Sequence, residues 1–221
     1  MTRCLHSVRR LLLAAGVLSL SLGQVSCTGL VKRDSTTAEV GGANLVVFVG
    51  RRIDVHQIAD PGESGSLDLR FAARFEVLDV IFGFISKGEV NFTAYDHYGE
   101  PAFARHQFAL LYVSKASDGT FFHQKYLSQP VFPTINGGWA SCGDPYAGKL
   151  RRGSVRAVPI NFSPSVTADL SGLSAEEIDQ QFPLEYFDRR GDIAVCKAGV
   201  FVDTLFEIQR EGALKERGVL R

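Results

Sequence analysis

One long stretch of alternating residues limits what this chain can fold into. Residues 67–83, LDLRFAARFEVLDVIFG, place apolar side chains at nearly every second position and charged side chains between them. The apolar face comprises Leu69, Phe71, Ala73, Phe75, Val77 and Ile81, and the polar face comprises Arg70, Arg74 and Glu76. A period of two is the repeat of a β-strand, so the pattern predicts a long strand with one buried side. A helix is the alternative, but the β-rich composition and the terminal Gly83 favour a strand.

Further segments have the composition or the alternation of strands, and they are 43–55, 89–99, 105–115 and 120–134. Gly50 interrupts the first of them and indicates a bulge or a sharp bend. The dipeptide Asp118-Gly119 predicts a hairpin turn between the last two, because glycine supplies the positive φ that such a turn needs. Pro130 and Pro133 place the end of the last segment at an edge, since proline cannot donate to a ladder.

These strands, joined by short turns with no helix between them, predict a mainly β fold. We expect a small five- to six-stranded antiparallel OB-like barrel over residues 43–135, followed by a C-terminal helical extension over 136–221. A β-sandwich is the alternative. Along the third strand, Asn91, Thr93, Tyr95 and His97 share one side, and Phe92, Ala94 and Tyr98 share the other.

Three motifs in this region carry a family resemblance. ANLVVFVGRRIDV (43–55), RFEVLDVIFG (74–83) and EVNFTAYDH (89–97) resemble the opening of netrin-like domains, the OB-fold group that includes the tissue inhibitors of metalloproteases. The resemblance covers about 43–135 and implies a fold. In the inhibitors a free amino-terminal cysteine engages zinc. Ala43 occupies the corresponding region here, so that function is not implied.

The extension has local signals of its own. Residues 136–154 are glycine-rich and loop-like, and 155–162 are a candidate sixth strand. Ser174 and Glu177 have the spacing of a capping box, which predicts a helix. Pro183 limits that helix to about two turns.

A second helix is expected near the carboxyl end. Asp203 is placed to cap it. Its apolar stripe comprises Leu205, Phe206, Ile208 and Leu214. Gly218 is placed to end it.

The amino terminus has the features of a secretory signal peptide over residues 1–26. Arg3, Arg9 and Arg10 precede an apolar run at 11–22. That run has about 12 residues, whereas a membrane-spanning helix needs about 20. We therefore expect export rather than a transmembrane helix.

The end of this segment, Gln24-Val25-Ser26-Cys27, resembles the cleavage box of bacterial lipoproteins. The resemblance implies that Cys27 is the lipid attachment site, that 27–42 form a tether, and that the chain partners a membrane through its anchor. Thr28 after the cysteine favours the outer membrane of the cell envelope, by analogy with enteric bacteria. Cleavage after Gly23 is the alternative, and it would leave a soluble periplasmic or secreted protein.

The cysteine count bears on both readings. Cys4 leaves with the signal peptide. If Cys27 is lipidated, Cys142 and Cys196 remain as an even pair in an oxidising compartment, which predicts a disulfide between them. If Cys27 is a free side chain, one cysteine of three is left over. Two buried thiols too far apart to bridge are the alternative to the disulfide.

Charge argues against nucleic acid as a partner. The chain has 24 basic and 24 acidic residues, and the signal segment holds three arginines and no acid. The remaining chain therefore has 21 basic and 24 acidic residues, a net charge of −3 with neutral histidine. Binding to nucleic acid needs a concentrated cationic surface instead.

The sequence contains no phosphate loop, no Rossmann glycine pattern and no serine-hydrolase motif. No cofactor and no catalytic residue is therefore expected. His97, His106 and His123 lie on successive candidate strands and could form a zinc site, although histidines at the barrel surface or rim are the alternative. Trp139 follows two glycines in a predicted loop. We expect it to cover the barrel end or the disulfide, with ligand stacking as the alternative.

Together these features predict a cell-envelope lipoprotein that acts as a binding or assembly module for another envelope protein, a peptide or a glycan. A periplasmic inhibitor of a protease or other hydrolase is an alternative suggested by the netrin-like resemblance. A hydrolase that uses His97 or His123 is the third hypothesis.

Overall fold

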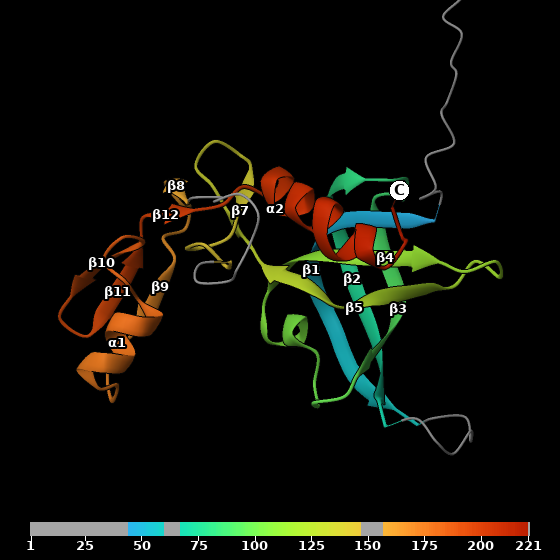
Figure 1. Ribbon diagram of the computed structural model, residues 1–221, viewed down its shortest axis with the longest axis horizontal. Coiled ribbons are helices and arrows are strands. Elements are labelled where there is room, and N and C mark those ends of the chain that lie inside the picture. Colours follow the sequence, from blue (N-terminus) through green and yellow to red (C-terminus); the bar gives the residue numbers. More distant parts are fainter. Residues whose placement is uncertain (1–43, 60–66, 147–156, 221) are drawn as a thin grey trace, which may run out of the picture. The chain divides into compact units, whose positions relative to one another are not determined.

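The computed structural model describes residues 44–59, 67–146 and 157–220. The predicted signal peptide, Cys27 and the tether lie outside these residues. The first long strands form a closed barrel with the order β1-β2-β3-β5-β4 (Figure 1). Its strands are β1 (Leu45–Ile58), β2 (Leu69–Phe82), β3 (Gly88–Asp96), β4 (Phe108–Lys115) and β5 (Phe121–Pro130). The expectation of a mainly β fold built on a small OB-like barrel is confirmed.

One feature of the barrel differs from the expectation that its strands are all antiparallel. The barrel closes where Thr93 of β3 meets Phe122 of β5, and this pairing is parallel. It arises because a 3-10 helix (Ala102–Arg105) and β4 intervene between β3 and β5, so β5 reaches β3 by a crossover. The predicted hairpin turn between β4 and β5 is present, with Gly119 at φ +90°.

The barrel interior is filled by apolar residues from every strand. Alternation along β2 sends Phe71, Ala73, Phe75 and Val77 into this core, as their spacing predicts. Phe103 of the 3-10 helix is fully buried against it. The predicted irregularity at Gly50 is present, because the register between β1 and β2 shifts there.

A second core lies on the outer side of β1 and β4. Leu45, Val47 and Val49 face it, and so do Leu110 and Tyr112. The helix that covers them is α2 (Val202–Gln209), which continues through a π-helical turn, Arg210–Leu214. Both faces of β1 and β4 are therefore buried at this point, which explains their near-continuous apolar composition.

Two local predictions are wrong. The cap of α2 is Phe201, without a side-chain hydrogen bond, and Asp203 lies inside the first turn instead. There its charge still favours the helix N-terminus. The third strand, expected over 89–99, ends at Asp96, so Tyr98 leaves the side that it was expected to share with Phe92 and Ala94 and is 86% exposed.

The remaining chain forms a small third core beside short strands. They are β6 (Phe132–Pro133), β7 (Trp139–Ala140), β8 (Val158–Pro159), β9 (Thr167–Asp169), β10 (Phe187–Arg190), β11 (Ile193–Cys196) and β12 (Ala198–Gly199). The candidate sixth strand is reduced to β8, which pairs with β12. Helix α1 (Ala175–Gln181) begins at Ser174 with the predicted capping box. The predicted disulfide joins Cys142 to Cys196, whose Cα atoms lie 6.0 Å apart.

Candidate functional site

The outer face of β3 carries polar and aromatic side chains. Alternation turns Val90, Phe92 and Ala94 into the core. Asn91, Thr93 and Tyr95 must then point outward, as their spacing predicts. The ring of Tyr95 is stacked on Phe122 of the adjoining strand, 6.5 Å between centroids.

A groove of about 500 Å³ crosses this face. We call it the polar groove. It is lined by Asp54 and His56 of β1, Ala72–Arg74 of β2, Asn91–Thr93 of β3 and Gly119–Phe121 at the β4–β5 turn. The three strands lie side by side in register, with His56 opposite Ala72 and Arg74 opposite Asn91. The groove therefore runs across three strands and ends at the turn.

The polar groove offers both donors and acceptors. The Nδ1 atom of His56 lies 2.7 Å from Oδ2 of Asp54, so the carboxylate orients the imidazole ring. The guanidinium of Arg74 lies 3.5 Å from a carboxylate oxygen of Glu89. All four side chains are about half exposed or more, so they remain open to a ligand. An exposed ion pair of this kind contributes little stability, which makes a purely structural role weak.

The wall of the groove is held by a compact turn. The backbone N–H and the hydroxyl of Thr120 both donate to Oδ1 of Asp118, at 2.9 and 2.7 Å. These hydrogen bonds lower the pKa of Asp118. The wall is therefore preformed rather than dependent on a ligand for its shape.

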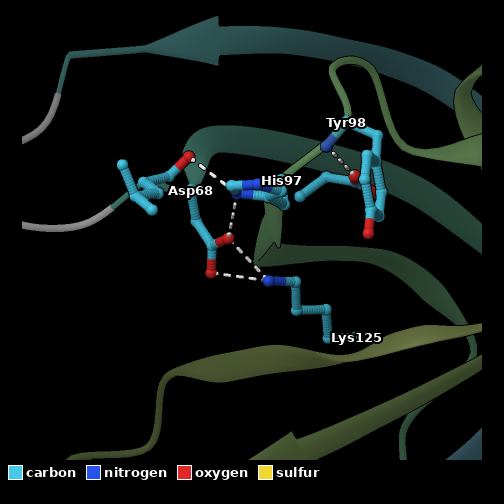
Figure 2. A network of polar contacts seen from close by, with 6 residues as sticks. Asp68, His97, Tyr98 and Lys125 are labelled. Carbon is cyan, nitrogen blue, oxygen red and sulfur yellow. Dashed lines mark hydrogen bonds and ion pairs between the residues drawn. The ribbon is translucent and has the colours of Figure 1, made fainter.

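A second group of side chains, the tyrosine cluster, comprises Asp68, His97, Tyr98, Lys125 and Tyr126. Figure 2 shows the first four of these residues. The Lys125 ammonium donates to both carboxylate oxygens of Asp68, at 2.6 Å each. Nδ1 of His97 lies 3.6 Å from the same carboxylate and 3.2 Å from the carbonyl oxygen of Leu67. The hydrogen bond that Lys125 donates to Asp68 raises the pKa of Lys125, which keeps its amine charged.

Two exposed rings lie beside this network. The centroids of Tyr98 and Tyr126 are 6.1 Å apart, and the ammonium of Lys125 lies 5.0 Å from the centroid of Tyr126. Tyr126 is 50% exposed. An exposed tyrosine ring supplies a large apolar face with a polar tip, which suits a binding surface.

The backbone at Tyr126 is held in an unfavourable conformation. Its φ is +65°, and it is the one residue other than glycine with a positive φ in the part of the chain that the structure describes. The register between β4 and β5 passes from Leu111–Ser128 to Val113–His123, so β5 carries extra residues at 124–127. This bulge turns Lys125 and Tyr126 toward the cluster. A left-handed conformation costs a non-glycine residue about 1–2 kcal/mol, and such strain is concentrated at functional sites.

The three candidate histidines do not share a site. His97 belongs to the tyrosine cluster, whereas His123 is buried in the barrel between the rings of Phe92 and Phe103. His106 follows the 3-10 helix, where burial and then the charge of Arg105 lower its pKa. Over 44–59, 67–146 and 157–220, no group of three or more His, Cys, Asp or Glu side chains is arranged to hold a metal ion.

Trp139 is partly buried and packs against the second core. Its ring centroid lies 5.1 Å from that of Phe108, and it contacts the cluster that α2 covers. It is not among the residues that line the polar groove. This position agrees with a covering role at the barrel rather than with stacking on a ligand in the groove.

Several site residues had no signal in the sequence analysis. Asp54 and His56 are two apart on β1, which places them on one face, but only the pairing of β1 with β2 brings them beside Arg74. Lys125 and Asp68 are 57 positions apart.

In the part of the chain that the structure describes, no helix is both long and apolar enough to cross a membrane.

Comparison with known proteins gave no relative: no family model, no curated protein and no solved structure matches this chain.

Proposed function

We propose that this chain is a lipid-anchored protein of the bacterial cell envelope that binds a glycan on the outer face of β1, β2 and β3. The observation that carries the proposal is the polar groove, in which carboxylate, imidazole, guanidinium and amide side chains project from adjacent strands. Hydroxyl groups of a sugar both donate and accept, so they can pair with each of these groups.

The aromatic residues on the same face support a sugar ligand. Tyr95 and Phe122 are stacked between the polar groove and the tyrosine cluster, and Tyr98 and Tyr126 are exposed. Apolar faces of sugar rings pack against such side chains. OB-type barrels also bind oligosaccharides and oligonucleotides on the face of strands 2 and 3. The net charge of −3 predicted for the exported chain favours the first of these ligand classes.

The competing hypotheses gain less support. His123 is buried in the barrel core, which argues against a hydrolase that uses its imidazole on a substrate. His97 lies on the surface near Asp68, and a hydrolase that uses His97 stays a prediction. Inhibition of a protease rests on the netrin-like resemblance alone and stays a prediction.

A binding experiment tests the glycan proposal. The lipid-free chain (residues 28–221) is titrated with solubilised peptidoglycan glycan strands and with lipopolysaccharide oligosaccharides in a calorimeter. Arg74→Ala and Asn91→Ala should each weaken binding about tenfold or more, since each removes hydrogen bonds to the ligand. Arg210→Ala is the matched control, because Arg210 follows α2, forms exposed ion pairs with Glu207 and Glu211, and is not among the residues that line the polar groove. Equal affinity of Arg74→Ala and the control, or no binding of any glycan, would contradict the proposal.

The anchor is tested separately. Cys27→Ser should move the protein from the membrane fraction to the soluble fraction, and the mature wild-type protein should carry the mass of acyl chains. Unchanged fractionation of Cys27→Ser would refute lipidation at this residue.

A further inference from the structure

Two rows of side chains cross the polar groove, and each row takes one residue from each of three neighbouring strands. Cross-strand pairing defines the rows. The first comprises His56, Ala72 and Thr93, and the second comprises Asp54, Arg74 and Asn91. All of these residues line the groove. The first row therefore has a single methyl group at its centre, whereas the second row is polar throughout.

Ala72 gives the groove its depth. Its neighbours on the outer side of β2 are Arg70 and Arg74, whose side chains are much longer. His56 and Thr93 stand on either side of Ala72, on strands about 10 Å apart, since each strand lies about 4.8 Å from the next. A methyl-sized group of a ligand can reach the floor between them, whereas a longer side chain at position 72 would fill that space.

The two side chains beside this floor can serve as an acceptor and a donor. Nδ1 of His56 lies 2.7 Å from Oδ2 of Asp54. A carboxylate only accepts, so the proton of the neutral imidazole is on Nδ1 and Nε2 is an acceptor. The hydroxyl of Thr93 can donate. An amide that bonds through both its N–H and its carbonyl oxygen needs partners about 8 Å apart, which suits side chains on strands about 10 Å apart.

Charge around the groove favours an uncharged ligand group. The cations in the groove, or in contact with its lining, are Arg74 and Lys115. The carboxylates are those of Asp54, Glu89 and Asp118. Two positive charges thus stand against three negative ones, so a carboxylate or phosphate on the sugar gains no net attraction.

We propose that the polar groove recognises the acetamido group of an N-acetylated amino sugar. The proposal rests on the glycan binding of the proposed function and adds the chemical group that the groove selects. The acetamido methyl lies on Ala72, the amide N–H donates to Nε2 of His56, and the amide carbonyl accepts from the hydroxyl of Thr93. An acetamido group joins a methyl, a donor and an acceptor in one uncharged planar unit, so it uses all three members of the first row.

Two uncharged tetrasaccharides with the same linkage test this selection. Chitotetraose carries an acetamido group on each sugar, and cellotetraose carries a hydroxyl group at the same positions. The lipid-free chain (residues 28–221) is titrated with each in a calorimeter. We expect chitotetraose to bind at least about tenfold more tightly, because cellotetraose leaves the floor uncovered and one polar partner unpaired.

Two variants locate the preference in the groove. Ala72→Leu fills the space above the floor, so the affinity for chitotetraose should fall about tenfold, whereas that for cellotetraose should stay within about twofold. Thr93→Val keeps the shape of the side chain and removes only the hydroxyl, so it should also reduce the preference. Ala175→Leu is the matched control, because Ala175 is exposed on α1 and is not among the residues that line the groove.

The outcomes separate this proposal from glycan binding in general. Equal affinity for the two tetrasaccharides, or a preference that survives both Ala72→Leu and Thr93→Val, would overturn the selection of an acetamido group and leave glycan binding intact. Binding of peptidoglycan strands without binding of either tetrasaccharide would overturn it as well. The absence of binding to any glycan would contradict the proposed function, and this proposal with it.

Discussion

Nε2 of His123 lies 3.0 Å from the carbonyl oxygen of Leu127 and spans the bulge that displays Lys125 and Tyr126. A carbonyl can only accept, so Nε2 must carry the proton of the neutral ring. His123 therefore supports the tyrosine cluster from inside the barrel. The residue that resembled a rim histidine in the sequence contributes to the site indirectly.

Burial of His123 predicts a loss of stability in mild acid. Burial lowers its pKa from 6.5 to about 4, because the charged ring is poorly solvated in the core. The unfolded chain binds the proton first, so the free energy of unfolding is highest above pH 6.5 and falls as the pH drops toward 4. The loss over this window is about 3 kcal/mol.

Urea unfolding at pH 7 and pH 4.5 measures this effect. His123→Gln can still donate to Leu127 but does not titrate, so most of the difference between the two pH values should disappear. His97→Gln, at the surface, should keep it. A His123→Gln variant as acid-sensitive as the wild type would contradict the assignment.

Strain at Tyr126 predicts a separation of stability from binding. Asparagine tolerates a positive φ better than tyrosine, so Tyr126→Asn should leave the free energy of unfolding within about 1 kcal/mol of the wild type or raise it. The same change removes an exposed ring of the cluster and should weaken glycan binding about tenfold. Thermal unfolding and calorimetric titration of one preparation would measure both. A variant that loses stability and keeps its affinity would show that the strain serves the fold.

Much of the architecture was predictable because local sequence patterns indicate individual strands, turns and helices. The alternation of 67–83 identified β2, Asp118-Gly119 identified a hairpin, and the Ser174 capping box identified α1. The pair Cys142–Cys196 followed from counting cysteines in an oxidising compartment. Each of these signals acts within a few residues or depends on chemistry rather than on distance along the chain.

The candidate site was much less predictable. The segment HQKYL at 123–127 contains no glycine or asparagine that would indicate a positive φ. Tyr126 nevertheless has a positive φ, because it lies in the bulge of β5. Pairing of Asp68 with Lys125 depends on how strands distant in sequence close the barrel. His123 is buried because Phe103, on an unexpected 3-10 helix, fills the space beside it. These positions depend on how strands distant in sequence close the barrel, and no local sequence pattern predicts that closure.

The disulfide should contribute strongly to stability. Cys142 and Cys196 are 54 positions apart. A cross-link of that span lowers the conformational entropy of the unfolded chain, which stabilises the folded state by about 4 kcal/mol. In a Cys27→Ser background, Cys142→Ser with Cys196→Ser should lower the free energy of unfolding by roughly that amount in the chain-entropy estimate. Reductant should destabilise the parent protein similarly and leave the double variant unchanged. A parent protein whose free energy of unfolding is unchanged by reductant would contradict this contribution of the disulfide.

Close packing at Gly50 predicts that even a methyl group there is harmful. A Cβ atom at this position would lie 2.9 Å from ring atoms of both Phe48 and Phe75, inside the barrel core. Gly50→Ala should therefore lower the free energy of unfolding by about 1–3 kcal/mol, as overpacking of a dense core does. Gly138→Ala is the control, because its Cβ would meet only the hydroxyl of Thr134 at an ordinary 3.5 Å. Chemical denaturation of the two variants measures the difference. Equal stabilities would mean that β1 can shift at its bulge without cost, and the close approach of β1 to Phe75 would then not be a constraint on the fold.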